Sequence, residues 1–115
     1  MTKSLGNIDI PLITITDHQY HEKKKVIIIT GRVHPGESNS SFIAEGLIKS
    51  LCSENFSTKK LRKEYVFKVI PMLNPDGVIA GNYRTGFMGV DLNRIYDQDK
   101  ACFPETVALK KLVKS

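Results

Sequence analysis

Residues 26–37 read VIIITGRVHPGE, an apolar run followed by a polar loop. The run Val26–Thr30 is typical of a strand that is buried on both faces of a sheet, and Gly31 ends it. A helix is predicted soon afterwards, because residues 38–41 offer N-cap candidates and apolar residues then recur at helical spacing. These apolar residues are Ile43, Leu47 and Leu51. His34 and Glu37 therefore lie between the carboxyl end of a core strand and a helix, where open α/β sheets bind their ligands.

His34 and Glu37 have the chemistry of a pair of zinc ligands. Imidazole nitrogen and carboxylate oxygen commonly hold zinc, and catalytic sites use three protein ligands and a water molecule. A His-x-x-Glu spacing lets both side chains reach one ion when the pair lies in a turn that opens a helix. The spacing also arises by chance, and the alternative is a loop histidine followed by a glutamate that the helix dipole favours. The predicted strand and helix on either side favour the metal site.

A second strand is predicted at Tyr65–Met72, and the tetrapeptide Asn74–Gly77 follows it. By itself this tetrapeptide, Asn-Pro-Asp-Gly, is an ordinary turn signal. A strand, a helix and a second strand form a right-handed crossover in which the two strands run parallel. Both strands then end on the same side of the sheet, so we expect the loops that contain His34 and Asn74 to be neighbours.

The remaining segments complete an α/β fold with a mixed sheet and flanking helices. Pro11–Thr16 is predicted to be a strand that forms an antiparallel hairpin with the strand starting at Val26, Ser53–Glu64 a loop, and Pro104–Lys114 a closing helix. We expect residues 1–115 to form one domain. A sheet of about three strands leaves an unpaired apolar edge on the last core strand, and such an edge favours self-association.

Two arginines follow in a loop-rich part of the chain. Residues 77–89 contain four glycines and little periodicity, and a long irregular loop in a small domain is more often functional than not. The guanidinium groups of Arg84 and Arg94 can pair bidentately with a carboxylate, and Asn93 adds amide donors beside Arg94. The alternative is two solvated surface arginines.

The motifs together resemble the zinc carboxypeptidases, and most closely the cytosolic branch that trims glutamate from protein tails such as those of tubulin. The resemblance implies a zinc-carboxypeptidase-like (phosphorylase/hydrolase-like) fold that is cut short, with only the N-terminal half of the catalytic domain present. The matching stretches are Ser4–Gly6, Pro11–Thr16, Gly31–Ser41, Pro71–Val78, Gly81–Arg84 and Gly89–Arg94.

This resemblance also implies a role for each site residue. His34 and Glu37 would ligate Zn²⁺, and Arg84 would be catalytic, polarising the scissile carbonyl and stabilising the oxyanion. Asn93 and Arg94 would bind the terminal carboxylate of the substrate. The implied activity is zinc-dependent hydrolysis of C-terminal residues, glutamate in the first place, from proteins or peptides.

Some of the family's pattern has no counterpart in the chain. Gly36 stands where secreted digestive relatives carry Arg, as in the cytosolic branch, and Tyr96 stands where Trp is common. The family's third zinc ligand, general base and substrate-contacting Tyr have no match. His18 and His21 precede the strand that leads to His34, so about 17–20 Å separates them from a metal there. We therefore expect the 115-residue chain alone to hold zinc weakly and to be inactive.

Three other interpretations stay open at this point. A zinc hydrolase of small N-acyl amino acids shares the His-x-x-Glu and Asp-Leu-Asn-Arg-like elements, although Asn74–Gly77 favours the peptidase. A non-enzymatic module could bind carboxylate-rich chains through Arg84 and Arg94. The chain could also be an inactive fragment.

Charge and composition indicate where such a protein acts. The net charge of +5 suits acidic partners, although solvated loop lysines explain it equally well. No nucleic-acid-binding pattern accompanies the charge, and no apolar run or signal sequence indicates a membrane. Cys52 and Cys102 lack the spacing of a disulfide framework. We expect a cytoplasmic protein whose partners are acidic C-terminal tails, and the sequence leaves the oligomeric state open.

Overall fold

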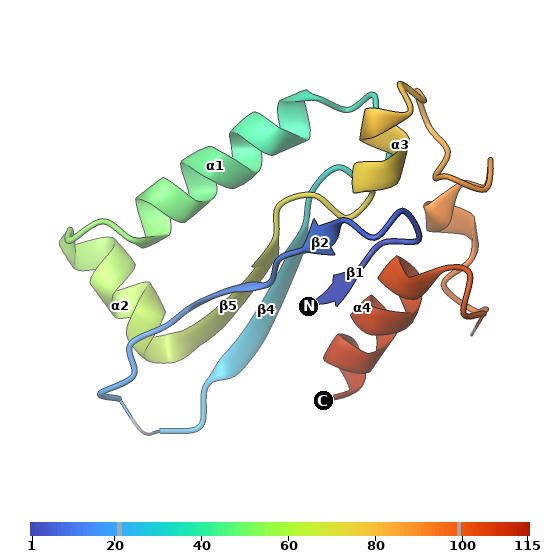
Figure 1. Cartoon of the computed structure of the whole chain (residues 1–115). Helices are drawn as coiled ribbons and strands as arrows, with labels where there is room; N and C mark the ends of the chain where they lie inside the picture. Colours follow the sequence, from blue (N-terminus) through green and yellow to red (C-terminus); the bar gives the residue numbers. More distant parts are fainter. Residues whose placement is uncertain (21, 99) are drawn as a thin grey trace.

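The computed structural model describes residues 1–20, 22–98 and 100–115 (Figure 1). In these described residues, two short strands precede a three-stranded sheet, and four α-helices and one short 3₁₀ helix connect or follow the strands. The elements are β1 (Thr2–Lys3), β2 (Asp9–Ile10), β3 (Ile13–Ile15), β4 (Lys25–Thr30), α1 (Asn39–Leu51), α2 (Phe56–Glu64), β5 (Tyr65–Ile70), α3 (Pro75–Ile79), η1 (Leu92–Arg94) and α4 (Pro104–Lys114).

The sheet is mixed, as expected, but its strand order differs from the prediction. β5 lies in the centre, parallel to β4 and antiparallel to β3, so the order is β3-β5-β4. The predicted hairpin between the first strand and the strand starting at Val26 is therefore wrong, because β5 pairs with both of them. The predicted parallel crossover from β4 to β5 is confirmed, with Lys25 opposite Tyr65 and Thr30 opposite Ile70.

The sheet is packed on both faces. On one face, Phe67 and Val69 pack with Leu51 of α1, and on the other Ile70 packs with Leu109 of α4. Alternate residues of β5 thus point to opposite layers, as the period of two along a strand requires. The layers in Figure 1 are accordingly α1, the sheet and α4, and α4 matches the predicted closing helix residue for residue.

Helix α2 replaces part of the predicted loop Ser53–Glu64. Its N-cap is Asn55, whose side chain accepts a hydrogen bond from the Thr58 N–H at 2.9 Å. Later in the helix, the Arg62 guanidinium donates to the carbonyl oxygens of Leu51 and Ser53, at 2.6 and 2.7 Å. These last carbonyls of α1 and its connection gain a charged donor, which fastens α2 to the end of α1.

Strand β4 is an edge strand in the part of the chain that the structure describes. Its neighbour on one side is β5, and no described strand pairs with its other side. Val26 is 54% exposed, but Ile28 packs against one core cluster and Ile27 and Ile29 against the other. β4 is therefore covered on both faces, as expected, although its residues are only partly buried. The unpaired apolar edge exists, but it lies on the first strand of the crossover and not on the last.

This edge predicts self-association that a single charge should weaken. Val26→Lys places a cation on the exposed edge, where charge opposes pairing with another strand. We expect size-exclusion chromatography with light scattering to show a shift of the 115-residue chain towards monomer. The matched control is Val113→Lys, because Val113 is 65% exposed at the end of α4, away from the edge. An equal shift in both variants, or a monomeric wild type, would contradict the edge assignment.

A buried acid beside the N-terminal segment gives the fold a pH dependence. Glu105 is 4% exposed, and its burial raises the pKa of its carboxyl group; the nearby Asp76 charge adds to this, against hydrogen bonds from the backbone of Glu105 and Leu5. Asp76 is itself held by the Ser4 hydroxyl at 2.7 Å and the Gly6 N–H at 2.8 Å. The folded chain therefore holds the Glu105 proton more tightly than the unfolded chain does.

The sign of the effect on stability follows from this raised pKa. The free energy of unfolding should fall as pH rises from the unfolded value of 4.5 through the folded pKa of Glu105, because the folded state binds more protons there. Urea unfolding across this pH range measures the slope, and Glu105→Gln should flatten it. Glu45→Gln is the control, because the hydrogen bond from Lys49 lowers the pKa of Glu45, so its effect on stability has the opposite sign and lies below pH 4.5; this variant should keep the slope above pH 4.5. A slope that survives in Glu105→Gln would refute the assignment.

Among the described residues, no helix is both long enough and apolar enough to cross a membrane.

Candidate metal and substrate site

The loops that follow β4 and β5 meet at one end of the sheet, as the crossover predicts (Figure 1). The Leu73 N–H donates to the Gly31 carbonyl at 2.8 Å, and the Asn74 N–H donates to the Arg32 carbonyl at 3.1 Å. The Asn74 side chain also donates to the Val33 carbonyl at 3.1 Å. The segment leading to His34 is thus fixed to the segment leading to α3.

Asn74 begins a helix here and not only a turn. Its side-chain oxygen accepts the Gly77 N–H at 3.0 Å, and Pro75 occupies the first helical position of α3. The turn expected for Asn74–Gly77 is therefore the N-terminal turn of α3. One Asn74 side chain caps α3 and also binds the His34 loop, which explains why it is buried.

His34 lies between two carboxylates. Its side chain is 11% exposed, with Nδ1 at 2.9 Å from Glu37 Oε1 and Nε2 at 3.1 Å from Asp91 Oδ1. Glu37 is 53% exposed, so the Nδ1 side of the ring faces the open side of the site and the Nε2 side faces the interior. The two predicted ligands are brought together, with one ring nitrogen and one carboxylate oxygen adjacent.

Arg32 shapes the loop that carries His34. Its backbone is left-handed, with φ at 51°, and its Nε donates to the Pro35 carbonyl at 3.0 Å. Its guanidinium also donates to the Ser41 hydroxyl at 3.1 Å, while the Ser40 hydroxyl accepts the Arg32 N–H at 2.9 Å. Arg32 therefore connects the end of β4 to the first turn of α1, on either side of His34 and Glu37.

Asp91 joins the histidine to the arginine, a role that the sequence interpretation did not give it. Besides His34, its carboxylate accepts the Arg84 Nε–H at 2.7 Å and the Asn93 N–H at 2.8 Å. Desolvation opposes ionisation of Asp91, but the hydrogen bonds from Asn93, Arg84 and His34 outweigh it and lower the pKa of its carboxyl group. Histidines that bind a metal usually donate their other ring N–H to a carboxylate or a carbonyl group. Asp91, an acid within the same set of motifs as His34, could have been proposed as a candidate for this role from the sequence.

The predicted substrate-binding residues lie in the same region. Arg84 is 47% exposed at its side chain and is held by Asp91. Asn93 and Arg94 lie in η1 and are exposed, and Arg94 donates to the Asn93 carbonyl at 3.1 Å. Within the described residues, Arg94 makes no hydrogen bond or ion pair to His34 or Glu37, so the structure brings Arg84 into the cluster and leaves Arg94 beside it.

The site depends on backbone segments that approach closely at two glycines. The Gly36 N–H donates to the Tyr83 carbonyl at 2.7 Å, and a Cβ at Gly36 would lie 2.5 Å from Cδ2 of the Tyr83 ring. A Cβ at Gly77 would overlap Pro35 Cγ. Tyr83 precedes Arg84, so the absence of a side chain at Gly36 lets the arginine loop pack on the histidine loop.

We predict that Gly36→Ala destabilises the fold and displaces the arginine loop. The added methyl group overlaps both the ring and the carbonyl of Tyr83, so the free energy of unfolding should fall by about 1–3 kcal/mol. Gly46→Ala is the matched control, because a Cβ at Gly46 meets nothing within 4 Å and lies within α1. This control should gain roughly 0.5–1 kcal/mol. Denaturant unfolding of both variants decides, and equal effects would rule out close packing at Gly36.

His34 and Glu37 fit part of a zinc site. Imidazole nitrogen and carboxylate oxygen atoms are zinc donors, and a hydrogen bond on Nε2 leaves Nδ1 free to bind a metal. No group of three or more His, Cys, Asp or Glu in the described part of the chain could hold a metal. His18 is exposed and lines a hollow with Arg62 at the opposite end of the sheet, and His21 lies outside the described residues.

Comparison with known proteins identifies the family. The model of the zinc carboxypeptidase family matches residues 1–109. The chain belongs to the zinc carboxypeptidase family. It is 47% identical over 107 residues to cytosolic carboxypeptidase 6 of Caenorhabditis elegans. The family predicted from the motifs is therefore confirmed.

Solved structures agree with the fold of this zinc carboxypeptidase chain. A metallo-carboxypeptidase from Burkholderia cenocepacia superposes with a TM-score of 0.90 at 29% identity, over 98% of this chain. An aspartoacylase family protein from Mesorhizobium loti gives a TM-score of 0.69 at 21% identity over 91% of this chain and 31% of that protein, a likeness of fold alone. The predicted carboxypeptidase-like mixed α/β fold is confirmed.

The matched region is a part of each longer relative. It covers 92% of this chain but 23% of the Caenorhabditis elegans protein, and 31% of the Burkholderia cenocepacia structure. The activity of a whole carboxypeptidase is therefore a separate question from the family of this chain.

Proposed function

We propose that this chain supplies one part of the active site of a zinc metallocarboxypeptidase that removes C-terminal residues, glutamate in the first place, from acidic proteins or peptides. The observation that carries the proposal is the continuous contact of His34, Glu37, Asp91 and Arg84 within a chain of the zinc carboxypeptidase family. This cluster places metal-ligand chemistry next to a fixed cation.

His34 Nδ1 and Glu37 Oε1 are the atoms that would hold the metal. When bound, zinc supplies Lewis-acid chemistry, namely activation of water and polarisation of a carbonyl group. Asp91 Oδ1 lies 3.1 Å from His34 Nε2, where it would accept a hydrogen bond from the Nε2–H group, leave the Nδ1 lone pair for the metal and fix the plane of the ring.

Arg84 is the residue that we assign to the oxyanion. Asp91 holds its Nε, which orients the guanidinium while its other nitrogen atoms make no described hydrogen bond. A donor fixed before the reaction stabilises developing negative charge without reorganising. Its position beside His34 puts that donor next to the carbonyl that the metal would polarise.

Arg94 and Asn93 are assigned to the terminal carboxylate of the substrate. Both are exposed on η1, and a guanidinium fork with a neighbouring amide suits bidentate binding of a carboxylate. Relatives of this chain carry the name cytosolic carboxypeptidase, which supports a cytoplasmic protein. The net charge of +5 supports acidic tails, such as those of tubulin, as substrates.

A zinc hydrolase of small N-acyl amino acids is the second candidate, supported by the fold shared with an aspartoacylase family protein. The match of the zinc carboxypeptidase model to nearly the whole chain favours the peptidase. A non-catalytic module that binds acidic tails through Arg84 and Arg94 needs the same cations but no metal.

Kinetics of a reconstructed domain test the proposal. We would join this chain to the remaining catalytic segment of the Caenorhabditis elegans relative and measure release of glutamate from a C-terminal glutamate peptide. Arg94→Ala should mainly raise KM, because it removes a contact that is present before the reaction. Arg84→Ala should mainly lower kcat, by about 10²–10³-fold, because its partner charge exists only in the transition state.

Matched measurements separate the alternatives. His18→Ala should leave both constants unchanged, whereas His34→Ala should abolish turnover. Deacylation of a small N-acyl amino acid without peptide hydrolysis would favour the second candidate. Peptide binding without turnover of either substrate would favour the non-catalytic module, and unchanged kinetics in both arginine variants would refute the site assignment.

A further inference from the structure

The end of the sheet opposite His34 carries two adjoining hollows of about 660 and 530 Å³. They share Lys60 and Lys63, and they lie where β4 and β5 begin, beside α2. The six residues of β4 separate this end from the His34 loop by ~20 Å at ~3.3 Å each. We call this end the basic pole, and its cations are Lys23, Lys25, Lys59, Lys60, Arg62 and Lys63.

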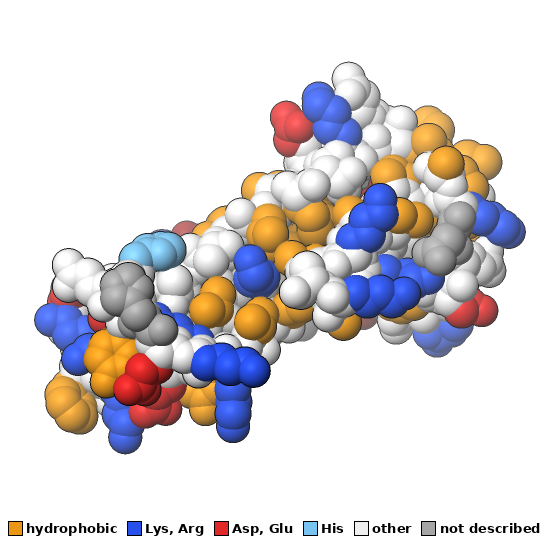
Figure 2. Space-filling view, turned by 90° about the horizontal axis from the view of Figure 1, so that it is seen from below, with side chains coloured by type: hydrophobic (Ala, Val, Ile, Leu, Met, Phe, Trp, Pro, Cys, Tyr) orange, Lys and Arg blue, Asp and Glu red, His pale blue; other side chains and the backbone are white. Residues whose placement is uncertain are grey.

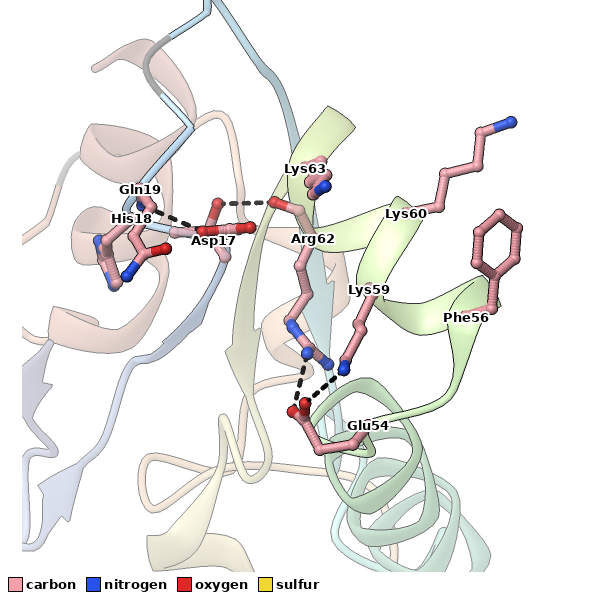
Figure 3. A pocket seen from close by; sticks show the side chains of 10 residues that line it. Asp17, His18, Gln19, Glu54, Phe56, Lys59, Lys60, Arg62 and Lys63 are labelled. Atoms are coloured by element: carbon pink, nitrogen blue, oxygen red, sulfur yellow. Dashed lines mark hydrogen bonds and ion pairs between the residues drawn. The ribbon is translucent and has the colours of Figure 1, made fainter.

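Partly buried hydrogen bonds hold the walls of the basic pole together. The Lys24 ammonium donates to the Thr16 hydroxyl at 2.9 Å, to the Arg62 carbonyl at 3.0 Å and to the Asp17 carbonyl. The Asp17 N–H also donates to the Arg62 carbonyl, at 2.9 Å. These bonds join the turn after β3 to the last turn of α2, the two segments that line the larger hollow. Figure 3 shows Asp17 and Arg62 on these two segments.

The outward cations of the pole can exchange their partners at little cost. Lys59 pairs with Glu54 at 3.0 Å and Lys60 with Glu64 at 3.9 Å, and all four side chains are at least half exposed. Exposed pairs of this kind contribute ~0–1 kcal/mol, so incoming carboxylates can replace the local ones. Figure 3 shows Lys60 pointing away from the hollow into solvent, whereas Lys59 and Arg62 point to Glu54.

Apolar surface lies among these charges. Phe56, the first residue of α2, is 85% exposed and lines the larger hollow, and its ring extends outward beside Lys60 (Figure 3). Tyr20 is 43% exposed and lines the smaller hollow, with the Lys63 ammonium 5.5 Å from the centre of its ring. Figure 2 shows Lys and Arg side chains gathered at both ends of one face, with exposed hydrophobic side chains among and between them.

We propose that the basic pole is a docking site for an acidic segment of a partner protein that also carries an apolar side chain. The cations would bind its carboxylates, and Phe56 with the lysine stems would cover its apolar group. The four carboxylates that line the hollows, Asp17, Glu22, Glu54 and Glu64, disfavour nucleic acid, whose phosphates form an unbroken row of negative charge. A peptide can place its own charges between them.

The docking site does not depend on the proposed hydrolysis. It shares no residue with the His34 cluster and lies at the other end of the sheet, so an acidic partner could bind there with or without turnover. Binding at the pole would hold an acidic protein close to the chain while its tail stays free to reach the His34 end.

Binding of a labelled peptide to the 115-residue chain tests this site. The probe is a short fluorescein-labelled peptide in which glutamates flank one leucine. Fluorescence anisotropy measures its Kd at low and at physiological salt. The double variant Lys60→Glu/Lys63→Glu should weaken binding about tenfold or more. Lys111→Glu/Lys114→Glu on α4 changes the charge equally at another exposed place and should stay within about twofold.

A second variant tests the apolar part and a competitor tests the class of partner. Phe56→Ser should weaken binding of the leucine peptide. It should not change binding of a control peptide that has glutamine in place of leucine. Circular dichroism confirms that each variant keeps its helices. Equal weakening in the two double variants, no binding of the peptide by the wild type, or tighter binding of a single-stranded oligonucleotide that Lys60→Glu/Lys63→Glu abolishes would each overturn the proposal.

Discussion

The candidate site depends on the hydrogen bonds that the Asp91 carboxylate accepts. The carboxylate accepts hydrogen bonds from three donors on three segments, namely the ring of His34 after β4, the guanidinium of Arg84 after α3, and the N–H of Asn93 in η1. A carboxylate offers acceptors only, whereas an amide would turn an NH₂ group towards one of these donors. The negative charge also balances Arg84, which would otherwise oppose a metal ion beside His34. One side chain thus holds both the histidine ring and the cation in position.

Asp91 can reach all three donors only because the loops meet without side chains between them. The parallel register places Thr30 opposite Ile70, so β4 and β5 end level with each other. Gly36 and Gly77 then leave room for Tyr83 and Pro35, whose atoms fill the space that a Cβ would need. Sheet register and glycine therefore act together, since the register brings the loops to one end and the glycines let them touch.

The sequence predicted the crossover, the closing helix and the placing of His34 beside Glu37, because each follows from local periodicity or from the handedness of a strand-helix-strand unit. It could not predict the order of the sheet, since β3 pairs with β5 across about fifty residues and no local pattern records that choice. Helix α2 was missed because it is polar and gains its stability from contacts of Arg62 with the end of α1. Asp91 stands in the motif Asp91–Arg94, but its contact with His34 could not be predicted, because the two residues are far apart in the sequence.

Contacts between described residues of this chain hold His34, Glu37, Asp91 and Arg84 together. A complete site could therefore form around a cluster that is already assembled. The side chains of Glu37 and Arg84 are each about half exposed, whereas the side chain of Asp91 is 16% exposed. The cluster therefore opens on the Nδ1 side of His34, where Glu37 lies. A segment that supplies a further ligand or a base needs only to approach that open side. The histidine ring, the carboxylates and the cation are already oriented, so little conformational entropy is lost when such a segment arrives. The basic pole is separated from this opening by the length of β4, so an acidic partner bound at the pole, as we propose, would leave the opening uncovered.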